Sequence, residues 1–160
     1  MTPIAHYLLA AALSGFMSIE DCRKWADKRI EICEKVEYWI LDVSMVKSVE
    51  ELHKAITPRL ERERSSTFAP SISNSVIGYY YHLYDEEKLS HDVFLRKAGA
   101  EADGGCADIE CEEIYEILNQ VESSKLEGSE LENTIYLMFN NFGENATQEW
   151  QHIQKYGLTG

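Results

Sequence analysis

Carboxylates are the side chains of this sequence that are gathered densely enough to do chemistry. Between Glu101 and Glu132 the chain has eleven Asp or Glu residues and a single base, Lys125, within a formal net charge of −13 for all 160 residues. Inward-facing carboxylates can hold a divalent metal ion or act as a general acid and base. Outward-facing carboxylates instead attract a positively charged partner. The spacing of the acids along their helix distinguishes these two uses.

The acids of this segment are predicted to face solvent. A helix is expected to begin at Asp108, and at roughly 100° per residue Glu112 and Glu116 point away from the apolar face that contains Ile114. We therefore predict a docking surface without a metal ion or cofactor. An ordinary solvent-exposed helix face is the alternative. The six carboxylates of the predicted surface, the last two at its rim, are Asp108, Glu112, Glu113, Glu116, Glu127 and Glu130.

Tyrosines form the second set of candidate binding residues. In the run 79–84, Tyr80 and Tyr84 belong to the apolar face of the expected helix, which leaves Tyr79 and Tyr81 on its other sides. A central helix that is buried all round would explain this pattern. The alternative is a set of aromatic anchors, because tyrosine is frequent at the energetic centres of protein interfaces. The tyrosines predicted to contact a partner are Tyr79, Tyr81 and Tyr115.

Sequence signatures of catalysis are missing. The chain has no G-x-S-x-G, no glycine-rich phosphate loop, no H-E-x-x-H and no EF-hand spacing. Its five histidines are scattered, and its four cysteines form no C-x-x-C pair. We therefore expect a protein that is not an enzyme, with reduced cysteines, although a Cys106–Cys111 disulfide stays open. An enzyme whose cleft combines distant His, Cys and Glu residues is the remaining alternative.

Composition narrows the range of partners. An acidic chain is a poor direct ligand for nucleic acid or for an anionic membrane surface, because both require clustered Lys and Arg. The first fifteen residues are apolar but contain no Lys or Arg, unlike the basic start of a secretion signal. Thr2 as N-cap, Pro3 in the first turn and Gly15 at the end instead predict a capped helix. We therefore expect a cytoplasmic protein.

Apolar residues at helical spacing recur along the rest of the chain, and helix-capping residues separate them. No convincing alternation of apolar and polar residues indicates a β-hairpin. We therefore predict an all-α protein of seven to eight helices that form one compact domain over residues 1–160. For residues 36–46 the short apolar run fits a buried strand and a buried helix equally well.

Several local signals predict where helices begin and end. Pro58 is expected to end or kink the helix that contains it, and the run 59–64 alternates in charge, which is typical of a solvated helix face. Ser129 is expected to cap a helix that Gly143 ends. Thr147 is then expected to cap a last, separate helix.

Two stretches suggest a family. The sequences GFMSIEDCRKWADKRIE and YWILDVSMVKSVEELHKAI, within the range 15–56, resemble those of bacterial immunity proteins, which protect cells from polymorphic or contact-dependent toxins. The resemblance implies a cognate toxin domain as the partner, with a basic nuclease, for example an RNase, as the expected class. It implies no particular binding residue, because such proteins recognise their toxins through different surfaces. The alternative function is a helical adaptor or regulatory subunit that recognises a basic protein segment.

Overall fold

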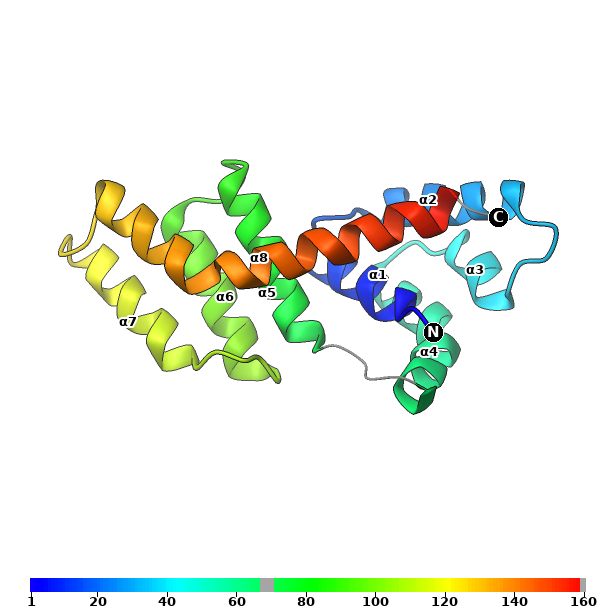
Figure 1. Cartoon of the computed structure of the whole chain (residues 1–160), viewed down its shortest axis with the longest axis horizontal. Coiled ribbons are helices and arrows are strands. Elements are labelled where there is room, and N and C mark those ends of the chain that lie inside the picture. Colours follow the sequence, from blue (N-terminus) through cyan, green and yellow to red (C-terminus); the bar gives the residue numbers. More distant parts are fainter. Residues whose placement is uncertain (67–70, 159–160) are drawn as a thin grey trace. The chain divides into compact units, whose positions relative to one another are not determined.

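The computed structural model describes residues 1–66 and 71–158, which form eight helices and no strand (Figure 1). The all-α prediction is confirmed, and so is the expected number of helices. No helix in this part of the chain combines the length and the apolar character needed to cross a membrane. The helices are α1 (Ile4–Leu13), α2 (Ile19–Ile32), α3 (Tyr38–Val43), α4 (Val49–Ser66), α5 (Ile72–Asp85), α6 (His91–Gly104), α7 (Cys111–Glu122) and α8 (Gly128–Leu158).

Contacts group the helices into two compact units. Among the described residues, one unit comprises 1–66 with 148–158, and the other comprises 71–147. Helix α8 contributes residues up to Thr147 to the second unit and residues from Gln148 onward to the first. The prediction that residues 1–160 form one domain stays a prediction. The two units are described in turn.

The first unit is built on α1, which is buried on nearly every side because its sequence is apolar around the whole helix. The segment 36–46 contains the short helix α3 and no strand, with Trp39, Ile40 and Val43 buried. The end of α8 is joined to α2, where the Trp25 indole N–H donates to the Ile153 carbonyl oxygen at 2.9 Å. These contacts enclose a core to which α1, α2, α3, α4 and the end of α8 contribute.

Helix α4 continues through Pro58 as far as Ser66, so proline does not end it. Pro58 has no N–H to donate to the carbonyl of Lys54, and both residues are exposed. Water can therefore take the place of the missing hydrogen bond.

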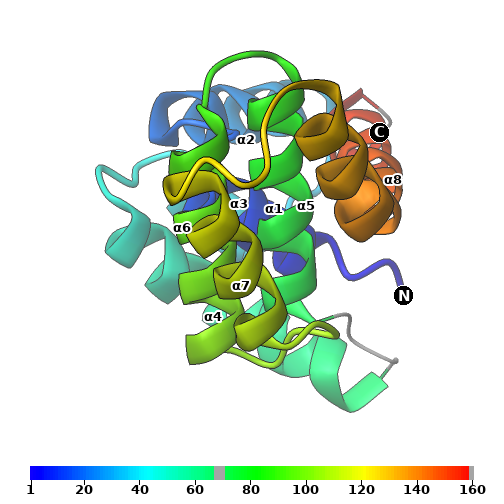
Figure 2. The ribbon, with the colours of Figure 1, turned by 90° about the vertical axis from the view of Figure 1, so that its left-hand side faces the viewer.

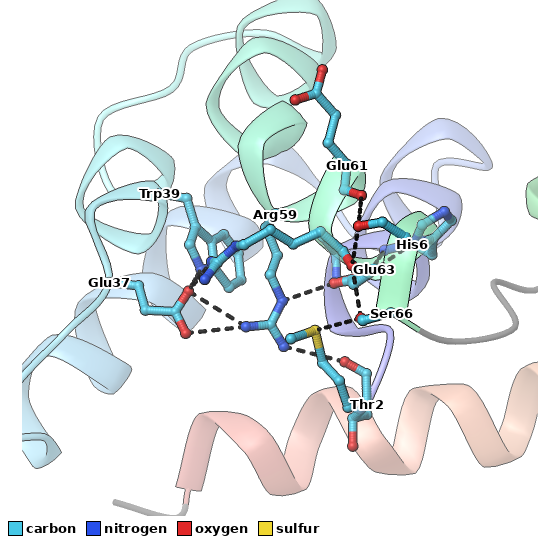
Figure 3. A network of polar contacts seen from close by, with 12 residues as sticks. Thr2, His6, Glu37, Trp39, Arg59, Glu61, Glu63 and Ser66 are labelled. Atoms are coloured by element: carbon cyan, nitrogen blue, oxygen red, sulfur yellow. Dashed lines mark hydrogen bonds and ion pairs between the residues drawn. The ribbon is translucent and has the colours of Figure 1, made fainter.

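The segment 59–64 is the clearest error of the sequence interpretation, because two of its charged residues are buried. Arg59 is 6% exposed and Glu63 is 0% exposed. The Arg59 guanidinium donates from Nε to Glu63 Oε2 at 2.9 Å and from Nη1 to Glu37 Oε1 at 3.0 Å (Figure 3). Its Nη2 donates to the Thr2 carbonyl oxygen at 3.3 Å. A buried charge that is paired on several sides avoids most of the cost of leaving water.

Glu63 also caps α1. Its carboxylate oxygens accept the backbone N–H groups of Ala5 and His6, each at 3.1 Å, and Oε1 lies 2.9 Å from His6 Nδ1. An anion at this position satisfies free N–H groups and faces the positive end of the helix dipole. The prediction that Thr2 caps α1 is wrong: the N-cap is Pro3, whose side chain cannot accept a hydrogen bond. A side chain from α4 therefore supplies the cap.

Acid should destabilise the first unit through this network. Burial alone would raise the pKa of Glu63, but the hydrogen bonds from His6, Ala5 and Arg59 outweigh it and lower that pKa. Burial would likewise raise the pKa of Glu37. Its contacts with Arg62, Trp39 and Arg59 outweigh this effect and lower that pKa. The unfolded chain then takes up these protons at a higher pH than the folded chain, so stability should fall as pH falls below about 4.3.

Urea unfolding midpoints measured between pH 6 and pH 3 would check this expectation. The Glu63→Gln protein, which lacks one of the two carboxyls, should show a shallower decrease over the same range. Equal decreases in the wild-type and Glu63→Gln proteins would show that Glu63 does not carry the effect.

The second unit contains α5, α6, α7 and the first part of α8, with α6 between α5 and α7 (Figures 1 and 2). Serine caps start two of these helices: Ser71 Oγ accepts the Asn74 N–H, and Ser90 Oγ accepts the Val93 N–H. At the centre, Phe94 meets Phe139 edge to face with ring centroids 4.8 Å apart. The buried residues around this pair are Ile77, Leu95, Ala98, Ile114, Leu118, Leu126, Leu131 and Ile135.

Helix α8 is continuous for 31 residues, so three boundary predictions are wrong. Ser129 lies inside the first turn, Thr147 does not start a new helix, and Gly143 does not end one. Gly143 is instead a contact point, because a Cβ there would lie 2.6 Å from Cδ1 of Tyr81. Gly78 plays the same part in α5, where a Cβ would lie 2.2 Å from the Phe142 carbonyl oxygen. Both glycines allow close packing of α5 and α8.

Candidate protein-binding surface

The outer face of α7 presents acids, as its sequence predicts. Ile114 and Leu118 are buried against the core of the second unit, while Glu112, Glu113 and Glu116 are exposed. In Figure 2 α7 lies toward the viewer, in front of α6. The two glutamates of the first turn, Glu112 and Glu113, also lie at the positive end of the helix dipole, where negative charge stabilises a helix. Helix α7 therefore carries a cluster of outward-facing charges.

These three glutamates have no cationic partner among residues 1–66 and 71–158. Glu122, at the end of the same helix, differs: its Oε1 accepts from Arg96 Nη2 at 2.7 Å, and Arg96 also pairs with Asp92. Arg96 thus neutralises the end of α7 and leaves the first half of this helix negatively charged. Charges in this state can attract a basic surface at long range.

Asp108 lies in the connection between α6 and α7, so the prediction that it starts a helix is wrong by three residues. It is nevertheless exposed and firmly held. The Asn74 side-chain amide donates to Asp108 Oδ2 at 2.8 Å, and the Asp108 N–H donates to Asn74 Oδ1 at 2.7 Å. Asp108 therefore ties the connection to the first turn of α5, and its carboxylate is already partly satisfied within the chain.

Glu127 and Glu130 are exposed at the start of α8. The Glu127 carbonyl oxygen accepts the Leu131 N–H at 3.4 Å, which begins the helix, and Gly128 has the positive φ of 62° that the turn requires. Glu130 lies in the first turn. Both residues thus lie in the second unit, at the start of α8, the helix that follows α7 in the chain.

The three predicted tyrosine anchors have different environments. Tyr79 is 0% exposed, so its prediction as a partner contact is wrong, and the alternative of a buried position is correct. Tyr115 is half-buried and packs on Gly99, where a Cβ would lie 2.5 Å from Tyr115 Cε1. Tyr81 is half-buried beside Phe94, with ring centroids 6.1 Å apart. Only Tyr81 and Tyr115 therefore have any surface left for a partner.

Two groups of side chains, one around Cys111 and one around His6 and Glu63, most resemble catalytic sites, and both are explained by the fold. At the start of α7, partial burial and then the Glu112 and Asp103 carboxylates raise the pKa of the Cys111 thiol to about 11. This thiol stays protonated at neutral pH and is a weak nucleophile. In the first unit, the Glu63 carboxylate beside His6 is occupied by backbone donors and by Arg59, which leaves it committed to the fold. No three His, Cys, Asp or Glu side chains within the described ranges are placed to hold a metal ion.

One feature of the second unit has no counterpart in the sequence interpretation: a groove bounded by α5, α6 and α8. Its residues form no recognisable sequence motif, because Tyr84 and Tyr136 are far apart in the chain and only the packing of the helices brings them to one groove. The one sequence feature that could have indicated the groove is the position of Tyr81, which lies off the apolar face of α5.

Comparison with known proteins gives no relative. No family model, no curated protein and no solved structure matches the chain.

Proposed function

We propose that this chain is a cytoplasmic immunity protein that binds and neutralises a cognate antibacterial toxin domain. The observation that carries the proposal is the set of exposed carboxylates on α7, Glu112, Glu113 and Glu116, which have no cationic partner among the described residues. The resemblance of residues 15–56 to immunity proteins supports the same proposal from a separate part of the sequence. The proposed partner is a nuclease with a basic active-site cleft.

The mechanism follows from charge. A nuclease cleft holds phosphates with Lys and Arg, and the α7 carboxylates would occupy the positions of phosphate groups. Opposite potentials accelerate the encounter, which favours capture of a toxin before it reaches nucleic acid. Charge-assisted hydrogen bonds between arginine and carboxylate would then hold the complex. The fixed helical backbone of α7 limits the conformational entropy that binding must remove.

Reversing the charge of α7 should abolish most of the binding. With a toxin domain that co-purifies with the wild-type chain from its host as the partner, the Glu112→Lys/Glu116→Lys protein should bind at least about 30-fold more weakly than the wild type. The dependence of its affinity on salt concentration should also be smaller. Isothermal titration calorimetry at two ionic strengths measures both quantities.

A matched control is available on α2, where Asp27 and Glu31 are exposed acids one helical turn apart in the other unit. The Asp27→Lys/Glu31→Lys protein has the same change in net charge and should bind normally. Unchanged affinity and salt dependence in the α7 variant would exclude this surface as the docking site. Failure of the wild-type chain to protect cells that produce the toxin would reject the function itself.

A further inference from the structure

The groove in the second unit is lined by the end of α5, the connection to α6 and the first part of α8. It is open to solvent, has a volume of about 560 Å³ and combines aromatic with acidic side chains. The residues that define it here are Tyr81, Tyr84, Asp85, His91, Glu132 and Tyr136.

The aromatic walls of the groove are held in place by the core. Tyr84 stacks on Phe94 with ring centroids 5.1 Å apart and an angle of 20° between the rings. His91 lies 5.3 Å from Tyr84 and Tyr81 lies 6.1 Å from it, again between ring centroids. Tyr136 is 51% exposed. A ligand would therefore meet ring faces and edges that are already positioned, with one exposed tyrosine at the margin.

The charges of the groove are predominantly negative. Its lining includes the carboxylates of Asp85, Glu87 and Glu132 and one ammonium group, that of Lys88. Lys88 Nζ already lies 2.9 Å from Glu86 Oε2. Asp85 and Glu132 form no ion pair with any residue in the described ranges. The groove thus contains two carboxylates that are available to pair with a cationic ligand.

The hydroxyl groups of Tyr81 and Tyr84 remain neutral beside these carboxylates. Burial raises the pKa of Tyr84, and the Glu132 carboxylate raises it further. Burial raises the pKa of Tyr81, with a further contribution from Asp85. Neutral phenol rings keep the electron-rich faces that attract cations, and their hydroxyl groups can both donate and accept hydrogen bonds.

We infer that this groove binds an arginine side chain presented by a protein partner. A guanidinium group is planar, stacks on tyrosine rings and pairs with carboxylates through a fixed set of donors, so it matches both features of the groove. A lysine ammonium group is more strongly hydrated and lacks the flat surface. An apolar side chain would leave Asp85 and Glu132 desolvated without a partner, and an anion would be repelled. The inference goes beyond the proposed function, because it concerns a different surface from α7.

The probe for this inference is a blocked Gly-Arg-Gly tripeptide, compared with two analogues. The citrulline peptide has the planar shape of arginine without its charge. The lysine peptide has the charge without the planar group. Titration of the 15N-labelled chain should give saturable shifts of the amide signals of residues 85–91 and 132–136, with a dissociation constant of ~1–10 mM. The lysine peptide should bind several-fold more weakly. The citrulline peptide should not saturate.

Variants of exposed groove residues locate the site without disturbing the core. Asp85→Asn/Glu132→Gln should weaken binding of the arginine peptide at least about 10-fold, and Tyr136→Ala should weaken it about 3-fold. Tyr38→Ala and Asp42→Asn/Glu50→Gln, at exposed residues of the other unit, are the matched controls and should leave it unchanged. Unfolding midpoints equal to that of the wild type would show that the variants are folded.

Three outcomes would overturn the inference. They are the absence of saturation by the arginine peptide, equal binding of the citrulline peptide, and wild-type affinity of the Asp85→Asn/Glu132→Gln protein. None of them bears on toxin binding by α7, which is tested separately by the charge-reversal variant.

Discussion

The Glu63→Gln protein is expected to lose about 3–5 kcal/mol of its free energy of unfolding, the range for breaking a buried ion pair. The substitution removes the negative charge that faces buried Arg59 at 2.9 Å. It also replaces one acceptor oxygen by an NH₂ group, so the backbone N–H groups of Ala5 and His6 can no longer both be satisfied. Urea unfolding followed by circular dichroism measures the loss as a shift of the midpoint.

Glu61→Gln is the matched control, since Glu61 lies on the same helix but is exposed. It removes the same charge and should change stability by less than about 0.5 kcal/mol. A Glu63→Gln midpoint as high as that of Glu61→Gln would mean that the buried network does not stabilise the fold.

The Gly78→Ala protein is expected to be destabilised by about 3 kcal/mol, because overpacking against backbone cannot be relieved by a side-chain rotation. The added methyl group would lie 2.2 Å from the Phe142 carbonyl oxygen and 2.8 Å from Ala146 Cβ. Helices α5 and α8 would have to move apart where Gly78 meets Phe142. Thermal unfolding of the full chain measures the effect.

Gly104→Ala provides the comparison. Gly104 is the last residue of α6, and a Cβ there would have no neighbour within 4 Å. Alanine is the better helix former, so this protein should be as stable as the wild type or slightly more stable. Equal behaviour of the two variants would show that the contact between α5 and α8 tolerates a wider separation.

The sequence was sufficient where a signal is local. The apolar spacing of Ile114 and Leu118 defines the inner face of α7, and the outward direction of Glu112 and Glu116 follows from the geometry of one helix. The all-α class follows in the same way from repeated helical periods. These features depend on residues within a few positions of each other, which is the range over which periodicity is informative.

The predictions from sequence were wrong where a residue that is distant in the chain determines the local structure. Gly143 looks like a helix end, but Tyr81 lies where its side chain would be, and the helix continues. Arg59 and Glu63 look solvated, but α1 needs a cap and Pro3 cannot supply one. Tyr79 lies off the apolar face expected for its helix, but the fold buries it completely. The groove is invisible in sequence for the same reason.

The cap of α1 has a consequence for synthesis of the chain. Helix α1 leaves the ribosome before α4 does, and the acceptor for its first turn follows 57 to 58 residues later. Short isolated helices are marginal in water, so a nascent chain exposes an apolar segment with unsatisfied amide groups until α4 has been made. Translation speed across residues 49–66 thus sets how long that segment stays open to aggregation.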